Sequence, residues 1–130
     1  MTLPPNAKVE AAPNFLANLD STFRFFLTQD ADSAAARFAK LKADLREMIT
    51  VLAWSPASAR PARFILTNAA QTMLKARAVM TLAEQAGLPH LREYVVGQHI
   101  VLYAHSESDV VLLALKHQRQ LIYSADAGPA

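Results

Sequence analysis

The chain has 130 residues, of which 52% are hydrophobic and 18% are charged, so it can bury the core of one domain and is not expected to be disordered. It contains no cysteine, which excludes disulfides and thiolate metal sites. The net charge is only +2 and the basic residues are scattered. A protein that binds mainly through phosphate contacts usually has clustered lysine and arginine residues, so the charge pattern argues against that class.

The start of the chain and its apolar runs indicate where the protein works. Residues 1–7 lack the apolar core of a signal peptide and are expected to be flexible. No run approaches the roughly 18 consecutive apolar residues of a membrane span. We therefore expect a cytoplasmic protein that does not enter the membrane.

The first half predicts a short strand over residues 8–12, anchored by Val9, and then two helices. Pro13 opens the first helix, and apolar residues at three- and four-residue steps form its stripe. These residues are Phe15, Leu16, Leu19, Phe23, Phe26 and Leu27. Asp32 or Ser33 is expected to cap the second helix. Its stripe consists of Phe38, Leu41, Leu45, Met48, Ile49 and Leu52. Together the two helices predict an antiparallel hairpin that needs a sheet to cover it.

A third helix is predicted over about residues 68–86, after a loop at residues 57–61. The segment Phe64–Leu66 between them is either a strand or an apolar plug. Asn68 begins a capping box, and Gly87 supplies the left-handed residue that ends the helix. The apolar residues of this helix are spread over more than one stripe. Two interpretations follow: a helix buried on its own domain with an alanine-rich surface, or a contact surface for a partner helix.

The last third of the chain predicts a three-stranded antiparallel meander over residues 91–96, 99–103 and 110–115. Tight turns at Gly97-Gln98 and at residues 106–109 join these strands. His117 and Arg119 follow the last strand, so they are expected at one end of the sheet, within reach of a partner. The predicted fold class is α+β, with a helical hairpin and one further helix packed on a small antiparallel sheet.

The run Val96–Tyr103, an acidic turn, an apolar strand and His117-Gln118-Arg119 together resemble the RelE/ParE superfamily, the toxins of bacterial type II toxin–antitoxin systems. A glycine, histidine and tyrosine in this order, followed by His-Gln-Arg, are more similar to the ParE branch. Ala59-Arg60-Pro61 resembles the Gly-Arg-Pro loop of the family. The resemblance implies one domain over residues 8–123 with a flexible tail at 124–130, and it makes the helix near residues 68–86 an insertion.

One position separates the two branches of the family. RelE-type nucleases carry an arginine where this chain has Ile100, and an aliphatic side chain cannot stabilise the charge on a scissile phosphate. The lysine-rich surface that those nucleases use against ribosomal RNA is also missing, although phosphate neutralisation supplies most of such affinity. The resemblance therefore implies a ParE-like toxin that binds and poisons DNA gyrase and is neutralised by a cognate antitoxin, without a cofactor and without sequence-specific nucleic-acid binding.

Two alternatives remain open. One is a RelE-like, ribosome-dependent mRNA endonuclease, which would be a metal-independent enzyme. In it His117 would transfer a proton, Arg119 would hold a phosphate and Tyr123 would stack on a base. The other is a non-toxic protein-binding module that acts through the inserted helix. A purely structural role at the sheet end is the competing interpretation for His117 and Arg119.

The residues expected to contact a protein partner lie in loops or near strand ends. They are Arg60, Arg63, Arg92, His99, His117, Arg119 and Tyr123. Arg92 either points to solvent or joins Arg119 in a basic rim. A metal site at His99, His105 and His117 is not expected, because no cysteine, paired carboxylate or HExxH motif supports it. Both a homodimer and a toxin–antitoxin hetero-oligomer are compatible with such a surface.

Overall fold

The structure is a computed structural model that describes residues 6–62 and 70–119. The predictions for Phe64–Leu66, for the cap at Asn68, for Arg63 and Tyr123, and for the tail at 124–130 lie outside these ranges. Within them, no helix is long and apolar enough to cross a lipid bilayer.

Five strands form one sheet in the order β1-β5-β4-β3-β2. In chain order the elements are β1 (Lys8–Ala11), α1 (Pro13–Gln29), α2 (Ala31–Trp54), the 3-10 turn η1 (Pro56–Ser58), β2 (Arg60–Pro61), α3 (Ala70–Ala86), β3 (His90–Val96), β4 (His99–His105) and β5 (Asp109–His117). β3, β4 and β5 form the predicted meander, and β2 pairs antiparallel with β3. β1 pairs with β5 in parallel. The predicted α+β fold is confirmed, with one parallel pair in an otherwise antiparallel sheet.

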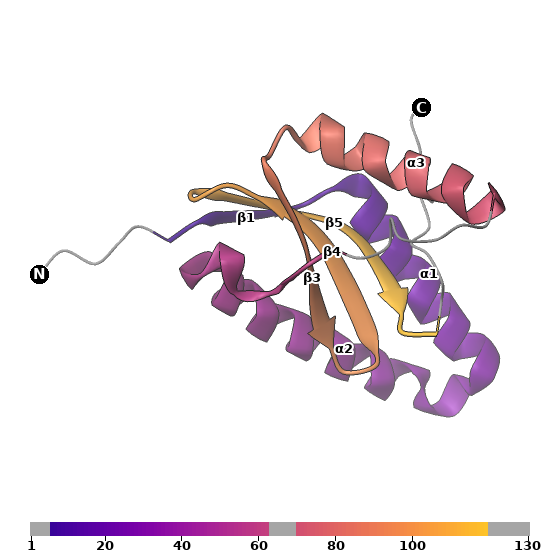
Figure 1. Cartoon of the computed structure of the whole chain (residues 1–130). Helices are drawn as coiled ribbons and strands as arrows, with labels where there is room; N and C mark the ends of the chain where they lie inside the picture. Colours follow the sequence, from indigo (N-terminus) through magenta and orange to yellow (C-terminus); the bar gives the residue numbers. More distant parts are fainter. Residues whose placement is uncertain (1–5, 63–69, 120–130) are drawn as a thin grey trace, which may run out of the picture.

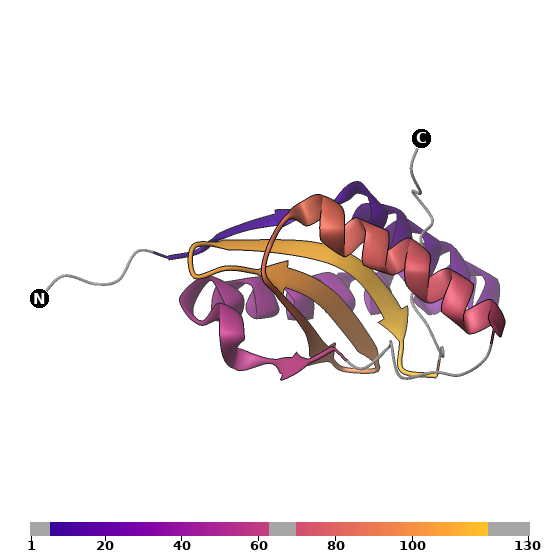
Figure 2. The same ribbon diagram turned by 45° about the horizontal axis from the view of Figure 1, so that its top comes forward.

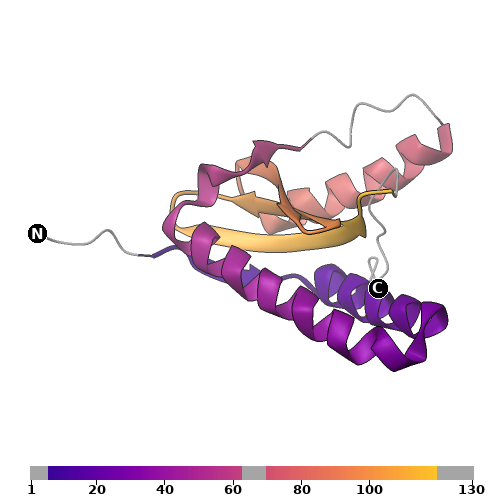
Figure 3. The same cartoon turned by 90° about the horizontal axis from the view of Figure 1, so that it is seen from below.

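The sheet lies between two helical layers, with α1 and α2 on one face and α3 on the other (Figures 1 and 3). Neighbouring residues of a strand point to opposite faces. In β4, Val101 and Tyr103 therefore pack under the hairpin, while Ile100 and Leu102 pack on the side of α3. All seven residues of this strand are buried, which explains why it reads as a nearly continuous apolar run.

α3 packs on its own sheet, over β4 and β5, as Figure 2 shows from a second direction. Met80, Ala83 and Ala86 contact the cluster that contains Leu102 and Leu113. Of the two interpretations of this helix, the structure shows the helix packed on its own domain, through side chains that are partly buried. The helix is followed by Gly87, whose φ of 67° is the left-handed conformation expected from the sequence.

A single residue, Asp30, connects α1 and α2. Its backbone is extended, and its carboxylate accepts a hydrogen bond from the Asp32 N–H at 3.1 Å. The prediction that Asp32 or Ser33 caps α2 is therefore wrong, because both already lie in the first helical turn. The short connector makes the two helices antiparallel neighbours, which brings residues near the end of α1 against residues near the start of α2.

The apolar stripe of α1 is narrower than predicted. Phe15 and Phe26 are buried, whereas Leu16 and Leu27 are 54% and 43% exposed. Each leucine directly follows a buried phenylalanine, and the helix turns by about 100° per residue. This rotation carries both leucine side chains off the face that meets the sheet.

Two buried asparagines of α1 complete the hydrogen bonding of β5. Asn14 Nδ2 donates to the Leu113 carbonyl, and the Leu115 N–H donates to Asn18 Oδ1, both at 3.0 Å. β1 ends opposite Leu112, so these backbone groups lie beyond the last residue that β1 can pair with. Since an unpaired backbone group in a core is costly, the two amide side chains replace a further strand and fix α1 on the sheet.

Candidate functional site

The end of the sheet beside the β3–β4 turn gathers histidine, arginine and phenylalanine side chains from four elements. We call Phe26, Arg37, His99, His117 and Arg119 the sheet-end cluster. His99 begins β4 and His117 ends β5, and the two residues pair directly in the sheet. Their rings meet edge to face with centroids 5.4 Å apart. The sequence predictions for His99, His117 and Arg119 thus fall on one small surface.

The helical hairpin supplies the other half of the sheet-end cluster. The Phe26 ring lies 6.1 Å from the His99 ring, centroid to centroid. The guanidinium carbon of Arg37 lies 4.1 Å from the centre of the Phe26 ring, within cation–π range. Arg37 Nη1 also donates to Gln29 Oε1 at 3.0 Å. These contacts follow from the one-residue connector, which places the start of α2 beside the end of α1.

The segment that carries His117 and Arg119 is fixed to the neighbouring turn. Gln118 donates its backbone N–H to the Gln98 carbonyl at 2.8 Å and its side-chain amide to the Gly97 carbonyl at 2.9 Å. Gly97 has a φ of 57°, a left-handed conformation that suits glycine in a two-residue hairpin turn. Arg119 is exposed, and it therefore projects from an anchored base.

The hydrogen bonds and burial decide which histidine nitrogens carry protons. The Arg119 N–H donates to His117 Nδ1 at 3.1 Å, so this nitrogen is the acceptor and the neutral ring carries its proton on Nε2. Burial, together with the nearby His117 and Arg37, lowers the pKa of His99. His99 is therefore neutral near pH 7, and the exposed guanidinium groups of Arg37 and Arg119 supply the permanent positive charge of the cluster.

Arg92 lies at the other end of the sheet, so the expected basic rim with Arg119 does not form. In the register of β3 with β4, Arg92 is opposite Tyr103, whereas the sheet-end cluster begins at His99. Arg92 does not point freely to solvent either, because Nη1 donates to the Ala59 carbonyl and Nε donates to His105 Nε2, both at 2.9 Å. The structure gives it a packing role.

The environment of Arg92 forms a second polar group, which we call the opposite-end cluster: His90, Arg92, Tyr103 and His105. The Arg92 guanidinium can only donate, so His105 Nε2 must accept and its Nδ1–H donates to the Ser106 carbonyl at 2.9 Å. Burial lowers the pKa of His105, in agreement with a neutral ring. The Tyr103 hydroxyl donates to the Pro56 carbonyl at 2.6 Å.

Arg60 lies apart from both clusters, on β2 at the edge of the sheet. Its Nε is 3.7 Å from Oε1 of Glu93, the residue that it faces across the β2–β3 pair. Glu93 is buried, so the positive charge of Arg60 is committed to a carboxylate of its own domain. Of the predicted contact residues that the structure describes, it brings together His99, His117 and Arg119, and it separates Arg60 and Arg92 from them.

Sequence reasoning missed Arg37 and did not give Phe26 a place in the site. An exposed arginine on a helix is usually read as part of a solvated face, and Phe26 as a core residue. The sequence offered one indication of their contact: Phe26 and Arg37 lie close before and after the Asp30 connector, and residues that flank a tight connection between two helices come close together.

The histidines do not form a metal site in the part of the chain that the structure describes, where no group of three or more His, Cys, Asp or Glu residues could hold an ion. His99 and His105 are at opposite ends of β4. At about 3.3 Å per residue they are roughly 20 Å apart, too far to share one ion.

No protein-family model matches this sequence, and no curated protein matches it. The resemblance to the RelE/ParE superfamily therefore rests on the residues quoted above and stays a prediction.

Proposed function

We propose that the chain is a ParE-like toxin of a type II toxin–antitoxin system, which acts in the bacterial cytoplasm by binding DNA gyrase and is held inactive by a cognate antitoxin. The sheet-end cluster is the surface proposed to meet gyrase. This mode of action is a protein–protein interaction and needs no acid–base pair on the toxin.

One observation carries the proposal: Arg37, stacked on Phe26, and the exposed Arg119, whose backbone bonds to His117, supply two permanent positive charges beside the packed rings of an anchored strand end. Arginine and aromatic side chains are enriched at the centres of protein interfaces. Because Gln118 fixes the strand end to the β3–β4 turn, little backbone entropy is lost when a partner orders Arg119. A small rigid base with exposed arginines suits recognition of a protein surface.

Two features favour this function over a ribonuclease. Ile100, at the position where RelE-type nucleases carry arginine, is only 6% exposed and packs in the apolar cluster on the side of α3. His117 uses Nδ1 to accept the Arg119 N–H, so protonation at Nδ1 would break that hydrogen bond. Both features weaken an acid–base mechanism at this end of the sheet.

The antitoxin is proposed to neutralise the toxin by covering the sheet-end cluster. A disordered antitoxin segment that folds on the toxin would bury apolar area and cover the sheet-end cluster. The exposed Leu16 and Leu27, eleven residues apart on one side of α1, offer apolar area for such a segment. Release of the antitoxin would then expose Arg37 and Arg119 to the target.

The function is tested with purified components. The proposal predicts that the chain inhibits supercoiling by gyrase and traps gyrase on cleaved DNA, and that it leaves mRNA on stalled ribosomes intact. Cleavage of that mRNA without any effect on gyrase would contradict the proposal and favour the endonuclease. Unimpaired growth of cells that make the chain without an antitoxin would instead favour the non-toxic binding module.

His117→Ala separates binding from catalysis. If the chain acts by binding, toxicity in cells should fall by less than tenfold, since only one partly buried ring of the surface is lost. General acid–base catalysis contributes roughly 10²–10⁴-fold to a rate, so abolished toxicity with an unchanged fold would contradict the binding mode. His90→Ala, at the opposite end of the sheet, is the matched control.

A further inference from the structure

β3 is paired along only part of its outer edge in the described residues. β2 is two residues long and pairs with Glu93 and Arg92, after which the Ala62 N–H donates to the Leu91 carbonyl. Polar groups of a strand in an antiparallel ladder point to the same side at every second residue. The N–H and carbonyl of Val95 therefore face the same open side as those of Leu91 and Glu93, and β2 does not reach them.

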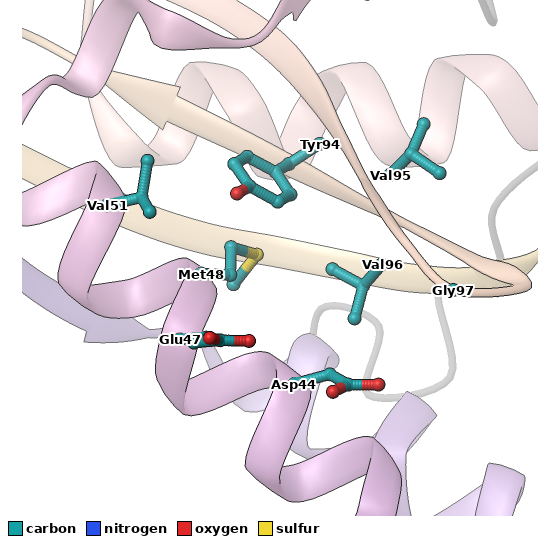
Figure 4. Close-up of a pocket in the computed structure, with 8 residues that line it drawn as sticks. All are labelled: Asp44, Glu47, Met48, Val51, Tyr94, Val95, Val96 and Gly97. Carbon is teal, nitrogen blue, oxygen red and sulfur yellow. The ribbon is translucent and has the colours of Figure 1, made fainter.

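A groove runs along this open edge, between β3 and α2. It consists of two adjoining hollows of about 460 and 370 Å³, which share Val51, Tyr94 and Val95 as lining residues. Figure 4 shows Met48 and Val51 of α2 directed toward Tyr94 of β3. Val95 is 46% exposed and Val51 is 39% exposed. Among the described residues, the groove thus combines an apolar wall with a strand edge that β2 leaves unpaired at Val95.

The rim of the first hollow is acidic, and Arg60, which lines the second hollow, pairs with Glu93 at 3.7 Å. Asp44 and Glu47 line the first hollow from the same side of α2 (Figure 4). Asp44 pairs with Lys40 at 3.2 Å, but Lys40 is highly exposed, and such a pair is weak and easily exchanged. Two carboxylates beside an open strand edge select a partner of positive charge.

A second copy of the chain is a poor occupant of this groove. If β3 paired with β3 of another copy, the carboxylates of Asp44 and Glu47 from both molecules would approach the same seam. Like charges brought together across an interface oppose association. The acidic rim therefore protects the edge against self-pairing, which is a common way to keep an open strand from aggregating.

We infer that the groove between α2 and the open edge of β3 is a docking site for an extended cationic peptide segment, which adds a strand next to Val95. Its backbone would exchange hydrogen bonds with the N–H and carbonyl of Val95. Alternate side chains would enter the hollows beside Val51 and Tyr94, and lysine or arginine side chains would meet Asp44 and Glu47. Strand addition of this kind takes affinity from backbone hydrogen bonds and specificity from the pockets.

This inference goes beyond the proposed function and does not depend on it. None of the residues that line the groove belongs to the sheet-end cluster. The chain could therefore bind a cationic segment here whether or not it binds gyrase through Arg37 and Arg119.

The experiment is a titration of the ¹⁵N-labelled full chain with two capped peptides, one of alternating lysine and valine and one with glutamate in place of lysine. The lysine peptide should bind saturably, shift the Val95 amide resonance and slow its hydrogen exchange. The glutamate peptide should bind at least about tenfold more weakly, a ratio equal to roughly 1.4 kcal/mol.

Two variants, each with a matched control, locate the site. Glu47→Lys should weaken binding of the lysine peptide at least threefold, while Glu84→Lys, the same change at an exposed position of α3, should leave it unaltered. Val95→Pro removes the outward N–H without removing a β3–β4 hydrogen bond, and should abolish the binding that Val95→Ile retains. The amide spectrum of each variant checks that it is folded.

Several outcomes would overturn the inference. They are equal binding of the two peptides, insensitivity to Glu47→Lys in a folded variant, and peptide-induced shifts confined to residues outside β3 and α2. A chain that dimerises through β3, with the dimer lost on Val95→Pro, would also overturn it, because the occupant would then be a second copy.

Discussion

The two ends of the sheet contain similar residues and use them differently. Each has two histidines on paired strands, with one arginine in the opposite-end cluster and two, Arg37 and Arg119, in the sheet-end cluster. At the opposite-end cluster, the guanidinium of Arg92 donates hydrogen bonds to the Ala59 carbonyl and to His105. At the sheet-end cluster, Arg119 is exposed, and its backbone rather than its guanidinium bonds to His117. The difference shows that the partners of an arginine decide whether it stabilises the fold or remains available to another molecule.

The largest effect expected from this comparison is on stability at the opposite-end cluster. Arg92→Ala should lower the free energy of unfolding by roughly 2–3 kcal/mol, because it leaves His105 Nε2 and the Ala59 carbonyl without their donor. Urea denaturation measures the change. Arg119→Ala is the control, expected below about 0.5 kcal/mol, and equal losses in the two variants would break the comparison.

The second effect concerns the strand that ends at His117. Asn18→Leu should cost about 1–2 kcal/mol of unfolding free energy, since the buried Leu115 N–H loses its acceptor. This result would show that β5 is stabilised by its hydrogen bond to α1 and not by the sheet-end cluster. Ser21→Ala, at an exposed position of the same helix, should be nearly neutral, and a loss as large there would contradict this assignment.

Acidification should lower the free energy of unfolding through a histidine at each end of the sheet, His99 and His105. Burial lowers the pKa of His99 and of His105 in the native state, while the unfolded chain keeps values of about 6.5. As the pH falls below about 6.5, the unfolded state takes up protons first, so stability declines until the pH has passed below the lowered native pKa values. Denaturation at pH 7.5 and at pH 5.5 measures this, and stability that rises on acidification would contradict it.

Removing His105 should sharpen the pH comparison. His105→Asn should reduce the pH dependence of the unfolding free energy, because one of the two depressed histidine pKa values is removed. An unchanged pH dependence in folded His105→Asn would contradict this assignment.

The smallest stability effect is expected at His117. His117→Gln should change the unfolding free energy by less than about 0.5 kcal/mol, since the ring contact with His99 and the hydrogen bond to the Arg119 N–H that it removes both lie at the exposed end of the sheet. A loss above about 1.5 kcal/mol in urea denaturation would mean that the sheet-end cluster is structural after all.

Most of the fold could be predicted from the sequence, because the spacing of apolar residues and the positions of turn residues determine most of its helices and strands. The meander, the hairpin and the glycine that follows α3 all appear where apolar spacing and Gly87 and Gly97 indicate. The parallel partner of β1 was not predicted, since a strand of four residues does not identify its neighbour. Leu16 and Leu27 were placed in the buried stripe because the exact rotation of α1 on the sheet is set by packing.

The site was predicted less completely than the fold, and Arg92 shows why. Its acceptor at Ala59 is a backbone carbonyl more than thirty residues away in the chain. Every residue type has such a carbonyl, so the residue at position 59 does not predict this hydrogen bond. Arg37 was missed for the related reason that its contact with Phe26 depends on a helical connection of one residue. Such partners follow from tertiary geometry, which apolar spacing does not specify.

The most direct test of the central claim compares two double variants in trapping of gyrase on cleaved DNA. Arg37→Ala with Arg119→Ala removes the exposed cations of the sheet-end cluster, and Arg24→Ala with Arg46→Ala removes two exposed arginines from other places on the helical hairpin. We expect the first double variant to lose at least about tenfold in trapping, equal to roughly 1.4 kcal/mol of binding, and the second to match the unaltered chain. Equal trapping by both folded double variants would contradict the account.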